Sequence, residues 1–176
     1  MVGILQKEDT DQLLKWIGGR RKFKLLYKIT RDGCSAPTFH SKCDNRGMTV
    51  TVLYNNNDTV YGGFTSQNWD DSGEYVSDPK AFLFQLRYNG RRSPNQFLIK
   101  PDKHTKAIYC HSKYGPTFGG GYDVTTFKNT VSESNGIFEL NLSFSLDYTY
   151  DMKNFDFNSF ANGNLQVRDL EVYQVD

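Results

Sequence analysis

The chain has 176 residues and a formal net charge of +1 at pH 7, with 38% hydrophobic and 23% charged residues. This length suits one domain around one core, and the composition excludes a disordered or fibrous chain. A near-zero net charge excludes a global field for nucleic acid or anionic membrane, so such binding needs a local patch. The 13 Phe, 11 Tyr and 2 Trp favour strands, so we expect β structure to dominate.

The chain also lacks the sequence features of secreted and membrane proteins. No run of about 18 apolar residues occurs, so we expect no membrane span. Residues 1–7 lack the apolar core of a signal peptide, and we expect a cytoplasmic protein. The three cysteines, Cys34, Cys43 and Cys110, are an odd number without a secretion signal. They are therefore predicted to be reduced, buried thiols rather than disulfides.

The first elements follow from local patterns. Residues 9–19 predict a short helix within an N-terminal extension 1–21, capped by Asp9 or Thr10 and closed by Gly18. Alternation at 23–27 predicts a strand, and Ser35 precedes a second short helix that ends at 45–47.

The rest of the chain reads as short strands joined by loops. Residues 48–54 and 59–65 predict a hairpin, 81–86 a compact apolar strand, and 165–173 a closing strand. Further short strands are expected at 97–99 and 107–110, and loops at 90–94, which is basic, and at 115–121, which is glycine-rich. Residues 125–163 have few regular signals and read as a variable, partly ordered insertion, in which 137–142 and 144–148 are the strand candidates.

Several sequence blocks, in order along the chain, together resemble the TLDc domain. They are residues 25–27 (LLY), 31–36 (RDGCSA), 39–44 (FHSKCD), 61–66 (YGGFTS) with Trp69, 77–84 (SDPKAFLF), 107–110 (AIYC), 115–121 (GPTFGGG) and 170–173 (LEVY). The match covers about 22–124 and 165–174. Cys34, Met48 and the 125–163 segment depart from the family pattern.

The resemblance implies a single α+β, mostly-β domain over residues 1–176, with two antiparallel sheets packed as a sandwich and two or more short flanking helices. Residues 13–28 are similar to the start of interferon-induced protein 44-like proteins, in which a GTPase domain follows and would carry any GTP site. The resemblance also implies a stress or antiviral setting, contacts with vacuolar ATPase subunits, and no catalytic residues.

Motifs for chemistry are sparse. Residues 115–121 lack the Gly-Lys-Ser/Thr end of a phosphate loop, and no nucleophile elbow occurs. Cys34, His40 and Cys43 are zinc-capable but lack a fourth ligand. Glu171 lies among apolar strand residues and is expected to face outward. We therefore expect no enzyme activity, no cofactor and no metal.

Three hypotheses for function remain. The first is a protein-interaction module anchored by loop aromatics, with Trp69, Tyr114 and Phe118 as candidates unless these rings are buried under folded loops. The second is nucleic-acid binding through a basic patch composed of Arg20, Arg21, Lys22, Lys24, Arg91 and Arg92. The third is a thiol-based oxidative-stress enzyme, which would use Cys34 at a helix N-terminus.

Overall fold

The structure, a computed structural model, describes residues 5–176. Residues 1–4, which belong to the expected N-terminal extension and to the stretch without a signal-peptide core, lie outside the described residues. The helices are α1 (Lys7–Ile17), α2 (Ile29–Asp32), α3 (Ala36–Cys43), the 3-10 helix η1 (Pro101–Lys106) and α4 (Phe157–Ala161). Within residues 5–176, no helix combines the length and hydrophobicity that a membrane span requires.

The described residues form one large sheet, here called the main sheet. It contains β1 (Phe23–Lys28), β3 (Thr49–Asn55), β4 (Val60–Thr65), β6 (Phe82–Tyr88), β7 (Arg91–Leu98), β12 (Glu133–Ser134), β13 (Ile137–Glu139) and β14 (Gln166–Val175). The strand order is β12-β13-β14-β3-β4-β6-β7, with β1 also paired to β14, and each pairing is antiparallel. The C-terminal strand β14 thus lies inside the sheet, where it pairs with β3, with β13 and with the N-terminal strand β1.

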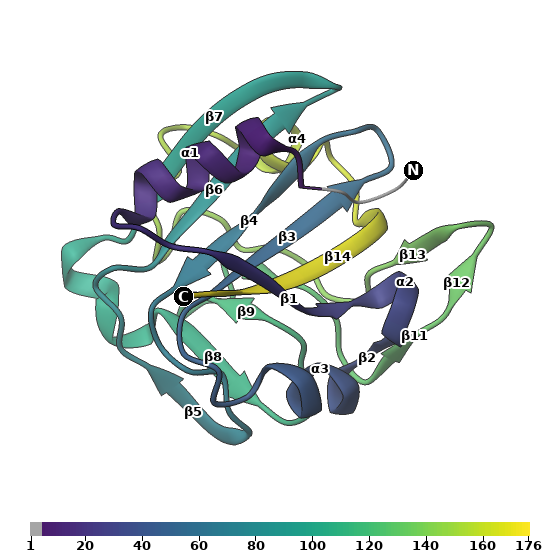
Figure 1. The fold of residues 1–176 in the computed structure, drawn as a ribbon, viewed down its shortest axis with the longest axis horizontal. Coiled ribbons are helices and arrows are strands. Elements are labelled where there is room, and N and C mark those ends of the chain that lie inside the picture. The colour runs from purple at the N-terminus through teal and green to yellow at the C-terminus, as the bar shows by residue number, and fades with distance from the viewer. Residues whose placement is uncertain (1–4) are drawn as a thin grey trace.

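A second sheet has the order β10-β9-β8-β5. Its strands are β5 (Ser72–Val76), β8 (Ile108–His111), β9 (Thr117–Phe118) and β10 (Val124–Thr125), while β2 (Cys34–Ser35) and β11 (Thr130–Val131) form a separate short pair. Figure 1 shows α1 lying across the β4–β6 part of the main sheet, with β5, β8 and β9 at the lower side of the view.

The two faces of the main sheet are covered by different layers. On one face Leu13 of α1 packs with Val50, Val52 and Phe84. The other face packs against the second sheet, α3 and the 125–163 segment, forming the larger core. Gly63 of β4 leaves room for Phe118 of β9, since a Cβ there would lie 2.6 Å from that ring. The mostly-β class and the antiparallel packing expected from the sequence are confirmed.

Local signals explain most of the early elements. Helix α1 ends at Gly18 as expected (φ 86°), but it starts at Lys7 rather than at Asp9. Gln6 is its N-cap, and Asp9 at the third helical position completes a reciprocal capping box. Helix α3 starts after Ser35 as expected, and 48–54 and 59–65 form the expected hairpin as β3 and β4.

Residues 91–94 of the basic loop expected at 90–94 are instead part of strand β7. Asn89 and Gly90, both at positive φ, make the tight turn between β6 and β7. Pro94 is compatible with β7 because this strand lies at the edge of the main sheet, where one side needs no amide donor.

The segment 125–163 contributes to the core although it has little regular structure. Tyr150, Met152 and Phe160 in it are fully buried in the larger core. Of its two strand candidates, 137–142 forms β13 in part, while 144–148 is not a strand. The segment expected as a variable, partly ordered insertion thus contributes buried side chains to the core.

Candidate functional site

Two of the three expected interface aromatics are buried. Trp69 and Phe118 are each 1% exposed, and their rings meet edge to face at a centroid distance of 5.5 Å. The indole nitrogen of Trp69 donates to the hydroxyl oxygen of Thr49 at 2.8 Å, which satisfies its polar group inside the core. The prediction that these two side chains contact a partner is wrong, because the segment around Trp69 and strand β9, which carries Phe118, place both rings in the core.

Tyr114 is half-buried and belongs to an aromatic cluster on the outer side of the second sheet. We call this cluster the tyrosine face, and it consists of Tyr75, Tyr109, His111, Tyr114 and Tyr122. Centroid distances between neighbouring rings are 4.7 Å for Tyr75–Tyr109, 5.3 Å for Tyr109–Tyr122 and 5.7 Å for Tyr109–Tyr114. The five rings form one continuous, partly exposed aromatic surface.

The alternation of strand side chains produces this face. In β8, Ile108 and Cys110 point inward and are fully buried, so Tyr109 and His111 point outward. The antiparallel register then places Tyr75 of β5 directly opposite Tyr109. The period-two pattern at 108–111 was readable from the sequence, but the pairing with β5 was not.

The loop that carries Tyr114 is held from below by a buried histidine. The Nε2 atom of His40, on α3, lies 2.8 Å from the carbonyl oxygen of His111 and 2.9 Å from that of Tyr114. Its Nδ1 atom lies 2.8 Å from the Oδ1 atom of Asp44, so each ring nitrogen has an oxygen within hydrogen-bond distance. His40 therefore fixes the position of Tyr114 rather than serving at the surface.

A buried carboxylate holds the loop that carries Tyr122. One oxygen of Asp123 accepts from the backbone amides of Thr149 at 2.8 Å and Tyr150 at 3.1 Å. Burial raises the pKa of Asp123 above its ordinary value, and these hydrogen bonds oppose that effect. Tyr122 itself has a positive φ of 58°, a conformation this loop must support.

Two lysines flank the tyrosine face. The Nζ of Lys106 lies 5.0 Å from the ring centroid of Tyr75, and that of Lys128 lies 5.9 Å from that of Tyr114. Neither lysine forms an ion pair with a carboxylate of the described residues. Burial raises the pKa of the Tyr75 and Tyr109 hydroxyls, so the rings are neutral at pH 7. Neutral rings beside unpaired cations suit aromatic and acidic side chains of a partner.

The expected basic patch is exposed but not continuous. Arg20, Lys22 and Lys24 follow the C-terminal end of α1, and Arg21 beside them is half-buried. Arg91 and Arg92 are the first residues of β7, whose last residue, Leu98, lines the same groove as Arg21. At 3.3 Å per residue, Arg92 lies roughly 20 Å along β7 from Leu98. Arg92 also donates to Gln12 of α1 at 3.1 Å.

The thiols are unsuited to redox catalysis. Cys34 is 2% exposed, and burial raises its pKa to about 12. Burial raises the pKa of Cys110 to about 12 as well, and that of Cys43 also rises. The prediction of an accessible, acidic Cys34 is wrong, because β2 places this side chain in the core. Within residues 5–176 no group of three or more His, Cys, Asp or Glu side chains is placed to hold a metal ion.

Iodoacetamide labelling at pH 7.5 tests this interpretation of the thiols. We expect Cys34 in the folded protein to react at least about tenfold more slowly than a free peptide thiol, because both burial and the raised pKa limit the thiolate. Denaturation in urea should restore the peptide rate. A native Cys34 that reacts as fast as the peptide would revive the thiol hypothesis.

A buried ionic cluster on the α1 side of the main sheet is a second polar feature. The Nζ of Lys28 pairs with Asp169 at 2.5 Å and with Glu171 at 3.0 Å. Asp169 also accepts from the backbone and hydroxyl of Thr30. Glu171 is buried, so the expectation that it faces outward is wrong. The ion pairs of the cluster connect β1 to β14, so we assign them a role in stabilising the fold.

The family of this chain is defined by comparison with known proteins. The model of the TLDc domain matches residues 3–176, so the chain belongs to the TLDc family. The matched range includes residues 3–21 of the expected N-terminal extension and the whole 125–163 segment.

Curated relatives share part of this domain. The MTOR-associated protein MEAK7 of Danio rerio is 28% identical over 69 residues, 39% of this chain and 15% of the relative. The GTPase-activating protein skywalker of Drosophila melanogaster is 29% identical over 110 residues, 55% of this chain and 19% of the relative. The chain thus spans less than a fifth of the length of these relatives.

Proposed function

We propose that this chain is a non-catalytic TLDc interaction module of a cytoplasmic protein, and that the tyrosine face is its partner-binding surface. The observation that carries the proposal is the cluster of partly exposed, neutral tyrosine rings with two unpaired lysines beside it. Tyrosine is enriched at binding hot spots because it offers a large rigid ring and a polar hydroxyl.

The names of the relatives support a regulatory role. MEAK7 is named for its association with MTOR, and skywalker for activating a GTPase. We propose that this domain likewise contacts a protein partner, for which vacuolar ATPase subunits are the candidates implied by the TLDc resemblance. The stress setting is supported by the TLDc resemblance, and the narrower setting, an antiviral protein with a following GTPase domain, only by the resemblance of residues 13–28.

Affinity capture from cell lysate tests the proposal, with the chain as bait and the double variant Y75T/Y109T beside it. Threonine keeps a strand-forming side chain but removes the paired rings. We expect the variant to lose its partner by about 30-fold or more in affinity, the effect of removing a hot spot of ~2 kcal/mol. Tyr88→Thr on β6 of the main sheet is the matched control and should bind like the parent chain.

A nuclease-treated sample separates the alternatives. A protein partner that survives nuclease and depends on Tyr75 and Tyr109 would support the proposal. Recovery that disappears with nuclease would instead assign the stacked rings and lysines to single-stranded nucleic acid. Equal capture by the parent chain and Y75T/Y109T would reject the tyrosine face as the binding surface.

A further inference from the structure

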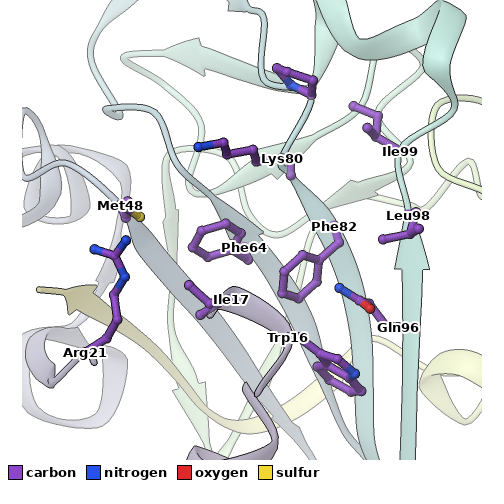
Figure 2. A pocket seen from close by; sticks show the side chains of 12 residues that line it. Trp16, Ile17, Arg21, Met48, Phe64, Lys80, Phe82, Gln96, Leu98 and Ile99 are labelled. Carbon is purple, nitrogen blue, oxygen red and sulfur yellow. The ribbon is translucent and has the colours of Figure 1, made fainter. Parts of the chain in front are cut away.

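A groove lies on the opposite side of the main sheet from the second sheet, beside the C-terminal end of α1 (Figure 2). Its volume is about 330 Å³. Aromatic rings form its floor: Phe64 and Phe82 stack at a centroid distance of 5.1 Å, and Trp16 meets Phe82 edge-on at 6.1 Å. Leu98 lies at one side and is 58% exposed, an unusual degree for a large apolar side chain.

The charges around the groove have a single sign. Figure 2 shows Arg21 and Lys80 on the side of the rings that faces away from Leu98. The residues that line the groove include no Asp or Glu. Neither Arg21 nor Lys80 forms an ion pair with a carboxylate in residues 5–176. An occupant that fits must therefore combine an apolar group with negative charge.

The shape favours a peptide side chain over a small molecule. The volume is at the lower end of the range for small-molecule sites, which begins at about 300 Å³, and this groove is partly open to solvent. An open apolar groove with charged edges is typical of sites where one side chain of a peptide is seated and its neighbours meet the rim. The adjacent Arg20 and Lys22 are exposed and extend the positive charge beyond the groove.

We propose that this groove binds an acidic segment of a protein partner. One large apolar side chain of that segment lies on Phe64, Phe82 and Leu98, while flanking Asp or Glu residues pair with Arg21 and Lys80. The surface lies on the α1 side of the main sheet, so it is separate from the tyrosine face on the second sheet. The two sites can therefore be lost independently.

A displayed library of random nonapeptides, selected on the complete chain, tests the groove without a known partner. We expect the enriched peptides to carry Leu, Phe or Trp next to Asp or Glu. The best of them, made as a fluorescent probe, should bind R21E/K80E at least about tenfold more weakly, because both favourable charge contacts become repulsive. Leu98→Asp should lose binding as well, and its exposed position makes it compatible with folding.

The double variant K106E/K128E is the matched control, because it makes the same change in net charge on the tyrosine face. It should bind the probe like the parent chain. An equal loss in R21E/K80E and K106E/K128E, or enriched peptides without acidic residues, would overturn the proposal. Binding of the chain to vesicles of phosphatidylserine that depends on Arg21 and Lys80, with no peptide selected, would overturn it in favour of a lipid surface.

Discussion

Replacing Gly62 with alanine is expected to unfold the domain at 25 °C or to cost at least about 4 kcal/mol of stability. A Cβ at this position would lie 1.8 Å from the carbonyl oxygen of Thr51 and 2.9 Å from the ring of Phe84. The carbonyl belongs to β3, the strand paired with β4, so it cannot retreat without separating the two central strands. Urea unfolding followed by circular dichroism measures the loss.

Gly18→Ala is the matched control for this prediction. Gly18 has a positive φ of 86°, but a Cβ there would have no atom within 4 Å, so only backbone strain remains. We expect a cost of about 1–2 kcal/mol there. Equal stability of the two variants would contradict the close backbone approach at Gly62.

Lys28→Met is expected to destabilise the fold by about 3 kcal/mol. It removes the cation that pairs with two carboxylates whose side chains are 0% and 3% exposed, Asp169 and Glu171. Leaving buried charges without a partner is far more costly than losing an exposed ion pair. The figure is at the lower end of the range for buried pairs because Lys28 is itself 20% exposed.

Two comparisons isolate this effect in the same urea experiment. Lys7→Met breaks an ion pair with Asp11 whose side chains are 88% and 56% exposed, and it should cost about 0.5 kcal/mol or less. Adding Asp169→Asn and Glu171→Gln to Lys28→Met should recover part of the stability. A Lys28→Met variant as stable as Lys7→Met would show that the buried cluster does not support the fold.

The sequence predicted the elements whose signals are local. The hairpin of β3 and β4 follows from β-branched alternation around a polar turn, and α3 follows from Ser35 before a first-turn proline. Only the end of β7 was expected as a strand, at 97–99. Residues 91–94 were predicted as a loop because Pro94 and its arginines are typical of loops, and edge position depends on the whole sheet. The burial of Tyr150, Met152 and Phe160 in 125–163 depends on long-range packing that no local pattern records.

The candidate site was predicted only in part. Tyr114 was identified as a loop aromatic, and it does lie on the tyrosine face. Trp69 and Phe118 were also predicted to be loop aromatics, but both are buried. Thr49 accepts the hydrogen bond of the Trp69 indole, and Gly63 leaves space for the Phe118 ring. The contribution of Tyr75 required the register between β5 and β8, which are separated along the chain by the β6–β7 hairpin.

Hydroxyl-radical footprinting of the captured complex tests the tyrosine face most directly. The oxidation of each tyrosine is compared by mass spectrometry between the free chain and the chain with its partner bound. We expect Tyr75, Tyr109, Tyr114 and Tyr122 to be protected together, while Tyr88 on the main sheet keeps its rate. Protection of Tyr88 with unchanged oxidation of those four would contradict the proposed binding surface.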